Sequence, residues 1–194
     1  METGKLNVGF LGFGEAGFHF AKDLTQAGLS GIVAYTPSGA KAAPDDPIRM
    51  RATEAGVELV SSPRELCQRA RLIIALVPGQ AALRALRSVR AYLGAAHVYV
   101  DASTAAVKAM ERAGQMLAGK SGFVDAAIMG TVALNGIKVL TVASGPARGS
   151  VPHADGALWN EYTSYWGKTR RGDCDEADPQ RVHEGTRRAA ARIA

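Results

Sequence analysis

The sequence predicts an α/β domain in which a mostly parallel β-sheet carries helices on both faces. Short apolar runs alternate with amphipathic stretches over residues 5–145, which is typical of a doubly wound sheet. The first apolar run ends in a G-x-G-x-x-G pattern at residues 12–17, directly before a helical stretch, as in βαβ units that bind dinucleotides. Branched aliphatic residues then become sparse near the C-terminus. We therefore expect a Rossmann-type domain over residues 1–146 and an irregular tail over residues 147–194.

The individual elements follow from the period of the apolar residues. Strands are expected at residues 6–11, 32–35, 71–77, 97–100, 122–124 and 138–142, with a further short strand over 57–60. Helices are expected over residues 15–27, 47–55, 63–70, 80–93 and 105–118. Right-handed crossovers would place a ligand crevice at the carboxyl ends of the strands.

Each glycine of the first loop has a physical task. Gly12 permits the tight turn off the strand, Gly14 lets the backbone approach a pyrophosphate, and Gly17 allows the helix to pack closely. The pyrophosphate would lie at the helix N-terminus, where free N–H groups attract an anion. The predicted cofactor contacts of this loop are Gly12, Phe13, Gly14, Glu15, Ala16 and Gly17. The alternative is a glycine turn without a ligand.

The end of the second predicted strand bears on the choice between NAD and NADP. A site for NAD usually presents Asp or Glu to the ribose 2′-hydroxyl about twenty residues after the glycines. Here the strand ends at Tyr35, and no acidic residue occurs until Asp45. Thr36, Ser38 and Lys41 would instead donate hydrogen bonds to a 2′-phosphate. The sequence thus favours NADP over NAD, with ordinary turn residues as the alternative interpretation.

Two later strand ends supply further candidate contacts. The strand over 71–77 ends in Val77 and is followed by Pro78, where the nicotinamide half of the cofactor would pass, and the alternative is an ordinary strand-to-helix turn with proline. Ser103 and Thr104 follow the next strand, and their hydroxyls would contact cofactor or substrate, cap the following helix, or do both.

Three motifs in order resemble the β-hydroxyacid dehydrogenase superfamily, which includes 3-hydroxyisobutyrate and 6-phosphogluconate dehydrogenases. They are the glycine loop, D-A-S-T at residues 101–104 and D-A-A-I-M-G at residues 125–130. The resemblance covers about residues 6–145. It implies that the first motif binds NAD(P), that the second lines the site, and that the third contacts the substrate through Met129, Gly130 and Thr131.

The third motif departs from the pattern of this superfamily. Ala127 replaces the usual proline, Met129 stands at the position of a substrate-anchoring serine, and Thr131 replaces the second glycine. The loss of the serine argues against a small hydroxy acid held by that hydroxyl.

The resemblance also implies a second, all-helical domain that carries a lysine as general acid/base. Lys168 follows Gly167 but has no matching motif around it, so no catalytic residue is predicted. Without a positioned proton donor, catalysis is expected to fall by about 10² to 10⁴. Residues 156–178, back-translated and read one base out of frame, permit a sequence like the missing continuation. We therefore hypothesise a frameshifted or truncated gene, with a hydroxy-acid substrate only in a complete relative. A further candidate function, imine reduction by a relative without the lysine, ranks lowest because it would need the same helical domain.

The tail after residue 146 offers two interpretations. Trp159, Tyr162 and Trp166 stand at helical spacing, or they cluster by accident in a disordered or loosely docked segment.

Composition excludes several other functions. The chain has 194 residues, a formal charge of +5 and 47% hydrophobic residues. Its basic residues are scattered without interleaved aromatic side chains, so nucleic-acid binding is not expected. The longest apolar run, residues 72–78, is too short to span a membrane, and no signal peptide is recognised. We expect a cytoplasmic protein. Cys67 and Cys174 have no metal-ligand spacing, so no metal is predicted.

A function of another class also fits the sequence. The chain would then be a non-catalytic nucleotide-binding or regulatory module, completed by a partner chain or by a second copy of itself.

Overall fold

The computed structural model describes residues 7–147 and the backbone of residues 162–164. The strands are β1 (Val8–Leu11), β2 (Val33–Tyr35), β3 (Glu58–Leu59), β4 (Leu72–Ala75), β5 (Val98–Asp101), β6 (Gly122–Ile128), β7 (Thr141–Ser144) and β8 (Tyr162–Ser164). The α-helices are α1 (Glu15–Gln26), α2 (Pro47–Glu54), α3 (Pro63–Arg69), α4 (Ala82–Arg90), α5 (Val107–Leu117) and α6 (Val132–Asn135). Short 3-10 helices are η1 (Gly39–Lys41), η2 (Gly79–Ala81) and η3 (Gly136–Lys138).

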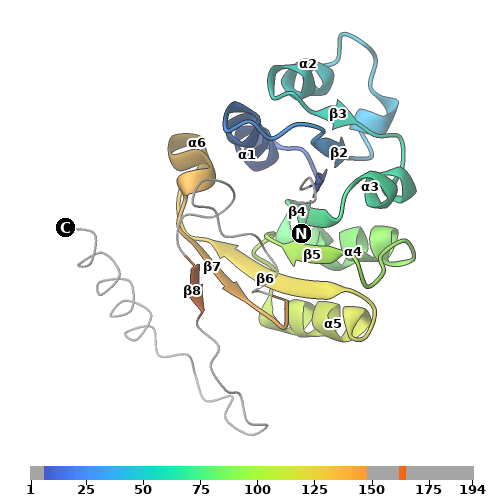
Figure 1. Cartoon of the computed structure of the whole chain (residues 1–194), viewed down its shortest axis with the longest axis vertical. Coiled ribbons are helices and arrows are strands. Elements are labelled where there is room, and N and C mark those ends of the chain that lie inside the picture. Colours follow the sequence, from blue (N-terminus) through green and yellow to red (C-terminus); the bar gives the residue numbers. More distant parts are fainter. Residues whose placement is uncertain (1–6, 148–161, 165–194) are drawn as a thin grey trace, which may run out of the picture.

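All the described strands form one sheet in the order β3-β2-β1-β4-β5-β6-β7-β8 (Figure 1). Strands β1 to β6 are parallel, β7 is antiparallel to β6, and β8 is parallel to β7. Strands β2 and β3 are added in order on one side of β1, and the chain then crosses to the other side of β1 to form β4. The strand order therefore reverses between β1 and β4, which is where sheets of this type bind ligands. The predicted Rossmann-type fold is confirmed.

Two hydrophobic layers cover the faces of the sheet. One layer contains Phe20 and Leu24 of α1 and Ala52 of α2, and the second contains residues of α3, α4 and α5 such as Leu66 and Leu86. Strand β1 is buried on both faces, as its continuous apolar run predicts for a central parallel strand. The sheet thus separates α1 and α2 from α3, α4 and α5.

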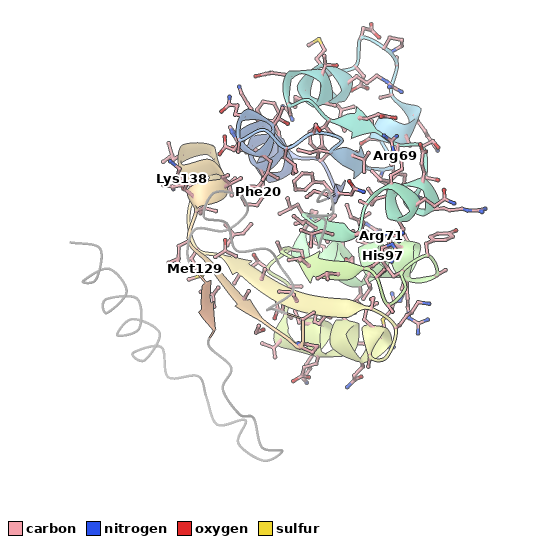
Figure 2. All side chains as sticks on the ribbon, viewed as in Figure 1. Phe20, Arg69, Arg71, His97, Met129 and Lys138 are labelled. Carbon is pink, nitrogen blue, oxygen red and sulfur yellow. The ribbon has the colours of Figure 1, made fainter. Side chains whose placement is uncertain are left out.

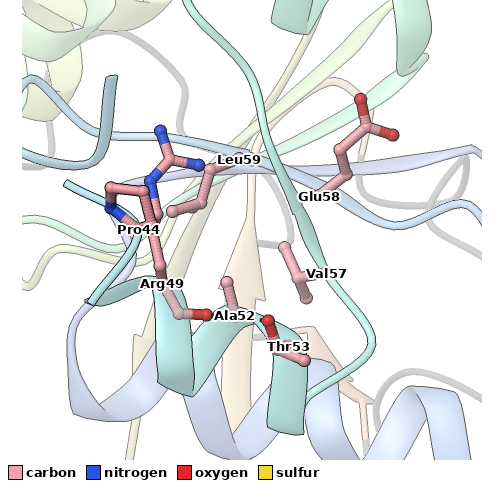
Figure 3. A pocket seen from close by; sticks show the side chains of 7 residues that line it. All are labelled: Pro44, Arg49, Ala52, Thr53, Val57, Glu58 and Leu59. Atoms are coloured by element: carbon pink, nitrogen blue, oxygen red, sulfur yellow. Dashed lines mark hydrogen bonds between the residues drawn. The ribbon is translucent and has the colours of Figure 1, made fainter. Parts of the chain in front are cut away.

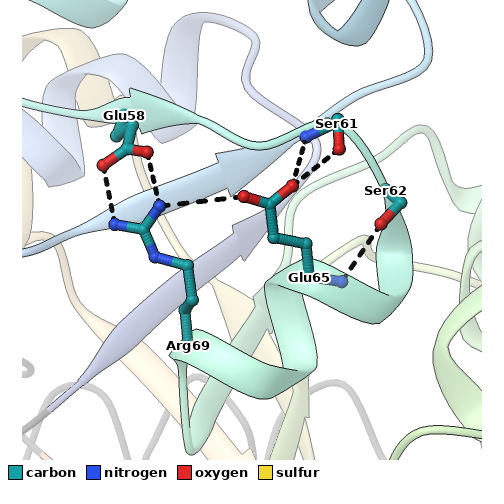
Figure 4. A network of polar contacts seen from close by, with 5 residues as sticks. All are labelled: Glu58, Ser61, Ser62, Glu65 and Arg69. Atoms are coloured by element: carbon teal, nitrogen blue, oxygen red, sulfur yellow. Dashed lines mark hydrogen bonds and ion pairs between the residues drawn. The ribbon is translucent and has the colours of Figure 1, made fainter.

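Strand β3, at one end of the sheet, is held by a polar network at the start of α3 (Figure 4). The Glu65 amide donates to Ser62 Oγ at 3.1 Å, and the Glu65 carboxylate accepts from the amide and hydroxyl of Ser61 at 2.9 and 2.7 Å. Arg69 forms a two-point ion pair with Glu58, and the hydrogen bond from Arg69 lowers the pKa of Glu58. Because the pair is exposed to solvent, it contributes at most about 1 kcal/mol. Its main role is to join α3 to β3.

The structure differs from the predicted elements in the second half of the chain. The helix expected over 80–93 begins as the 3-10 helix η2 and ends at Arg90. The strand expected over 138–142 begins only at Thr141, because residues 136–138 form η3. Val139 is nevertheless buried, so its apolar character reflects packing in the core and not strand pairing. The sequence did not predict α6, since four residues are too few to establish a helical period.

One strand lies within the predicted tail. Residues Tyr162–Ser164 pair with β7 as β8. The helical spacing considered for the aromatic residues therefore does not hold at Tyr162, while Trp159 and Trp166 lie outside the described residues. The rest of the tail prediction also falls outside them.

No helix in the described part of the chain is long and apolar enough to cross a membrane. Within the same residues, no three or more His, Cys, Asp or Glu side chains form a group that could hold a metal ion.

Candidate functional site

The glycine loop connects β1 to α1 at the point where the strand order reverses. Gly12 has a φ of 98°, and its amide donates to the Tyr35 carbonyl oxygen at 2.9 Å. A side chain at Gly12 would overlap the Leu76 carbonyl oxygen, which follows β4. A Cβ atom at Gly17 would lie 3.3 Å from the Gly12 carbonyl oxygen and 3.4 Å from the Phe13 ring. The loop is therefore packed tightly on its protein side.

Gly14 differs from the other two glycines because it faces open space. Among the described residues, a Cβ atom there would meet no atom within 4 Å, and its φ of −86° is accessible to any residue. Gly14 is the N-cap of α1 and no side chain caps the helix, so the first N–H groups of α1 lack a side-chain acceptor. Glu15 is exposed beside it and Ala16 is half-buried. This end of α1 has the polarity and the room for an anionic group.

The loop after β2 lies next to the glycine loop, since the Tyr35 carbonyl accepts from Gly12. Thr36 Oγ1 and Ser38 Oγ are 3.1 Å apart, and Lys41 ends η1 with an exposed side chain. No acidic residue occurs in this loop before Asp45. The structure therefore brings the predicted contacts of the second strand to the same edge as the glycine loop.

The turns after β4 and β5 pack against each other at this edge. A Cβ atom at Gly79 would lie 3.0 Å from the Thr104 carbonyl oxygen and 3.3 Å from that of Ser103. Val77 is half-buried and Pro78 exposed, and a Cβ atom at Gly12 would lie 2.9 Å from Val77 Cγ1. Through Val77, the turn after β4 therefore packs against the glycine loop as well as against the turn after β5.

Ser103 is held by Asp101 and does not cap a helix. Asp101 Oδ1 accepts from the Ser103 amide at 3.1 Å and from the Ser103 hydroxyl. Helix α5 begins four residues later, with Ala106 as its N-cap and no side-chain cap. The capping alternative is therefore wrong. Thr104 adopts a φ of 53°, which is rare for a β-branched residue and is typical of functional turns.

Two carboxyl groups lie on neighbouring strands, where Asp101 at the end of β5 pairs in register with Asp125 in the middle of β6. Asp101 is 1% exposed, and its Oδ2 has no hydrogen-bond partner among the described residues. Burial raises the pKa of Asp101 above 3.8, although hydrogen bonds from Ser103 oppose the shift. Burial also raises the pKa of Asp125, and the charge of Asp101 adds to this shift.

The third predicted motif ends β6 at the side of the molecule where α6 lies (Figure 2). Met129 is 52% exposed, and Gly130 and Thr131 are exposed beside it. The segment that follows packs on α1, where Asp23 Oδ2 accepts from the Ile137 amide at 2.9 Å. Sequence reasoning missed this contact, because no local pattern links two residues that are 114 positions apart.

The sequence matches a family model over residues 7–158, and that model describes the NAD binding domain of 6-phosphogluconate dehydrogenase. The chain belongs to this family. The matched region includes the glycine turn between β1 and α1 described above.

Solved structures share the fold of this domain. A conserved hypothetical protein from Sinorhizobium meliloti is 26% identical, with a TM-score of 0.68 over 77% of this chain and 50% of its own. A conserved protein of unknown function, noted for structural similarity with 3-hydroxyacid dehydrogenases, is 30% identical, with a TM-score of 0.62 over 75% of this chain and 52% of its own. The 3-hydroxyisobutyrate dehydrogenase of Mycobacterium tuberculosis is 22% identical and shares the fold, with a TM-score of 0.63 over 74% of this chain and 50% of its own. The chain spans about half the length of these proteins. No curated protein matches the sequence significantly.

A pocket of about 360 Å³ lies elsewhere on the NAD-binding domain, between α2 and β3 (Figure 3). Its lining residues are Pro44, Arg49, Ala52, Thr53, Val57, Glu58 and Leu59. The Thr53 hydroxyl donates to the Arg49 carbonyl oxygen at 3.0 Å, and the Glu58 carboxylate is paired with Arg69. None of the predicted cofactor or substrate contacts lines this pocket, so it is distinct from the predicted cofactor site.

The buried carboxyl of Asp101 predicts a pH dependence of stability for this NAD-binding domain. Because the folded pKa is raised above the unfolded one, the contribution of Asp101 is intact below about pH 4 and is lost as the pH rises through the folded pKa. Asp101→Asn removes this titration, so we expect its free energy of unfolding to fall less than that of the parent between pH 4 and pH 7. Urea denaturation across this range measures it, with exposed Asp45→Asn as control. The prediction would be contradicted if the free energy of unfolding changed with pH in the same way in the parent and in Asp101→Asn.

Proposed function

We propose that the chain is the NADP(H)-binding domain of an oxidoreductase of the β-hydroxyacid dehydrogenase type, formed by residues 1–146. The observation that carries the proposal is the open, uncapped N-terminus of α1 at Gly14, in a chain of the NAD-binding family. The pyrophosphate lies against the loop of residues 12–17. Tyr35, Thr36, Ser38 and Lys41 take the adenosine ribose, and Val77, Pro78 and Ser103 take the nicotinamide half.

The preference for NADP over NAD rests on the loop after β2. Its hydroxyl pair, Thr36 and Ser38, and the exposed amine of Lys41 are donors, which suit a 2′-phosphate. A carboxylate that would accept from a ribose 2′-hydroxyl does not occur between residues 35 and 44. NAD then binds with the lower affinity, because its 2′-hydroxyl gains no carboxylate partner.

The first test is replacement of Gly14 by alanine. A Cβ atom there meets no atom of the described residues within 4 Å, so we expect the fold to be kept while the pyrophosphate can no longer approach the backbone. We expect the Kd for NADPH to rise by at least about tenfold, which corresponds to the loss of about 1.4 kcal/mol. Titration of NADPH fluorescence measures it.

Gly94→Ala is the matched control for this variant. A Cβ atom at Gly94 also meets nothing within 4 Å in the described part of the chain, and this residue lies between α4 and β5, outside the predicted contacts. Its Kd for NADPH is expected to equal that of the parent. Equal affinities for the parent and Gly14→Ala would refute the assignment of the pyrophosphate site, and absence of saturable binding in the parent would refute cofactor binding.

The substrate would lie beside Ser103, Thr104, Met129, Gly130 and Thr131. None of these side chains titrates near neutral pH, so we propose that the 194-residue polypeptide binds cofactor with little turnover and that a small hydroxy acid reacts only in a complete relative. L-serine, present in the Mycobacterium tuberculosis structure, and 3-hydroxyisobutyrate are suitable probes. With NADP⁺ in excess, we expect no rise of absorbance at 340 nm above a blank. A substrate-dependent rise would overturn the proposed lack of turnover.

A non-catalytic module completed by a partner chain or a second copy is the alternative function. It is favoured by two large apolar side chains that are exposed in and after the third motif, Met129 at 52% and Leu134 at 84%. Exposed apolar surface is typical of protein interaction sites. Sedimentation velocity at several concentrations distinguishes these states. A defined dimer would support assembly of copies, and a monomer at all concentrations would exclude it.

A further inference from the structure

The loop proposed to hold the 2′-phosphate is stabilised by its own backbone hydrogen bonds and by close packing at Gly39. The Ala40 amide donates to the Thr36 carbonyl oxygen at 3.0 Å, and the Lys41 amide donates to that of Ser38 at 3.1 Å. Gly39 is buried, and a Cβ atom there would lie 3.3 Å from Leu59 Cδ1 and 3.4 Å from Ile48 Cδ1. The loop therefore already has a defined conformation in the structure without a ligand.

Arg49 fixes the far end of this loop. Its Nε donates to the Ala42 carbonyl oxygen at 2.9 Å across seven residues, in a half-buried contact. Ala42 is the C-cap of η1 and directly follows Lys41. Because Arg49 belongs to α2, this hydrogen bond joins the helix to the loop. Loss of the bond would free the end of η1 that carries Lys41.

The charges near the loop make its geometry important. Lys41 is the cation within residues 36–42, and no carboxylate lies there. The first acidic residues downstream are Asp45, which is exposed, and Asp46, whose carboxylate caps α2 by accepting from the Ile48 amide at 3.0 Å. Hydroxyl donors and one amine bind a phosphate well only when they are held together, because ordering flexible donors lowers the affinity.

We propose that Arg49 is a positioning residue for NADP(H): through the Ala42 carbonyl it holds Thr36, Ser38 and Lys41 in the arrangement that accepts the 2′-phosphate. This inference rests on the proposed function. It predicts that loss of Arg49 weakens the binding of the 2′-phosphate and leaves the binding of the rest of the dinucleotide unchanged. Sequence reasoning missed the residue because it lies fourteen positions after the strand end, within a helix.

The test measures the Kd of NADP⁺ and of NAD⁺, which differ only in the 2′-phosphate, for the full chain by calorimetry. In Arg49→Met, which keeps an unbranched side chain but no donor, we expect the Kd for NADP⁺ to rise by about threefold to tenfold, as for loss of one hydrogen bond. The Kd for NAD⁺ is expected to stay unchanged. Arg49→Lys retains one donor that can reach the carbonyl and should restore part of the affinity for NADP⁺.

Arg51→Met is the matched control, since Arg51 is exposed on the same helix and makes no hydrogen bond to the loop within the described residues. It removes the same charge, so an equal loss in both variants would mean that Arg49 acts through charge alone and would overturn the inference. Equal weakening of NADP⁺ and NAD⁺ in Arg49→Met would mean a merely structural role and would also overturn it. A parent that binds NAD⁺ and not NADP⁺ overturns the inference while cofactor binding stands, and a parent that binds neither refutes the proposed function itself.

Discussion

Gly12→Ala is expected to destabilise the domain by about 3–5 kcal/mol. Two effects combine at this residue. Its φ of 98° is strained for any residue with a Cβ atom, and the added atom would overlap the Leu76 carbonyl oxygen, which is backbone and cannot move aside cheaply. A domain of this size is stable by only about 5–15 kcal/mol, so the loss is a large fraction of the total. Urea denaturation followed by circular dichroism measures it.

Gly28→Ala separates the two effects in the same experiment. Gly28 has a similar φ of 94°, but a Cβ atom there meets none of the described residues within 4 Å. Its cost is therefore strain alone, about 1–2 kcal/mol. If Gly12→Ala costs no more than Gly28→Ala, close packing between the glycine loop and the turn after β4 is not what requires Gly12.

Gly136→Ala is expected to cost about 3 kcal/mol. Gly136 has φ 52° and ψ −136°, a backbone conformation nearly restricted to glycine. A Cβ atom there would also overlap Asp23 Oδ2, which displaces the carboxylate that accepts from the Ile137 amide. The variant should therefore loosen the segment that follows the third motif from α1. Thermal denaturation gives the loss of stability, and hydrogen exchange at Ile137 gives the local opening.

A double-mutant cycle identifies the contact responsible. Asp23→Ala removes the acceptor without altering the backbone at Gly136, and we expect it to cost about 1–2 kcal/mol. In the double variant the added methyl group no longer meets a carboxylate, so the combined cost should be smaller than the sum of the single costs. Simple additivity would show that the two residues act independently.

The parts of the site that the sequence predicted are those encoded within a few residues. The glycine loop could be recognised because a tight turn, an open backbone and close helix packing require glycine at fixed spacing. The structure shows the turn at Gly12 and the close packing at Gly17, and the approach of a pyrophosphate to Gly14 stays a prediction. Strands β1, β2 and β4 were also predictable, because strands buried on both faces read as continuous apolar runs. The segment over residues 136–142 was mispredicted, since burial of Val139 in a loop and burial in a strand produce the same apolar residue.

The contacts that join distant segments were not predictable. The sequence allowed the Ser103 hydroxyl to cap the following helix, and only the start of α5 at Val107 excluded that role. Arg49 reads as an ordinary exposed helix residue until its bond to Ala42 is seen. Asp23 gives no local signal at all, because its partner lies in the segment after β6.

The sequence by itself determined that this chain has a Rossmann-type fold and a glycine loop suited to a dinucleotide, because local backbone geometry and the alternation of apolar runs impose those residues at those positions. Only the tertiary structure decided which side chains join segments that are distant in the sequence or hold the loops after the strands. Asp23, Arg49 and Asp101 act by hydrogen bonds to the amide of Ile137, the carbonyl of Ala42, and the amide and hydroxyl of Ser103. Backbone partners carry no signature of their own in the sequence, so such bonds become visible only when the chain is folded.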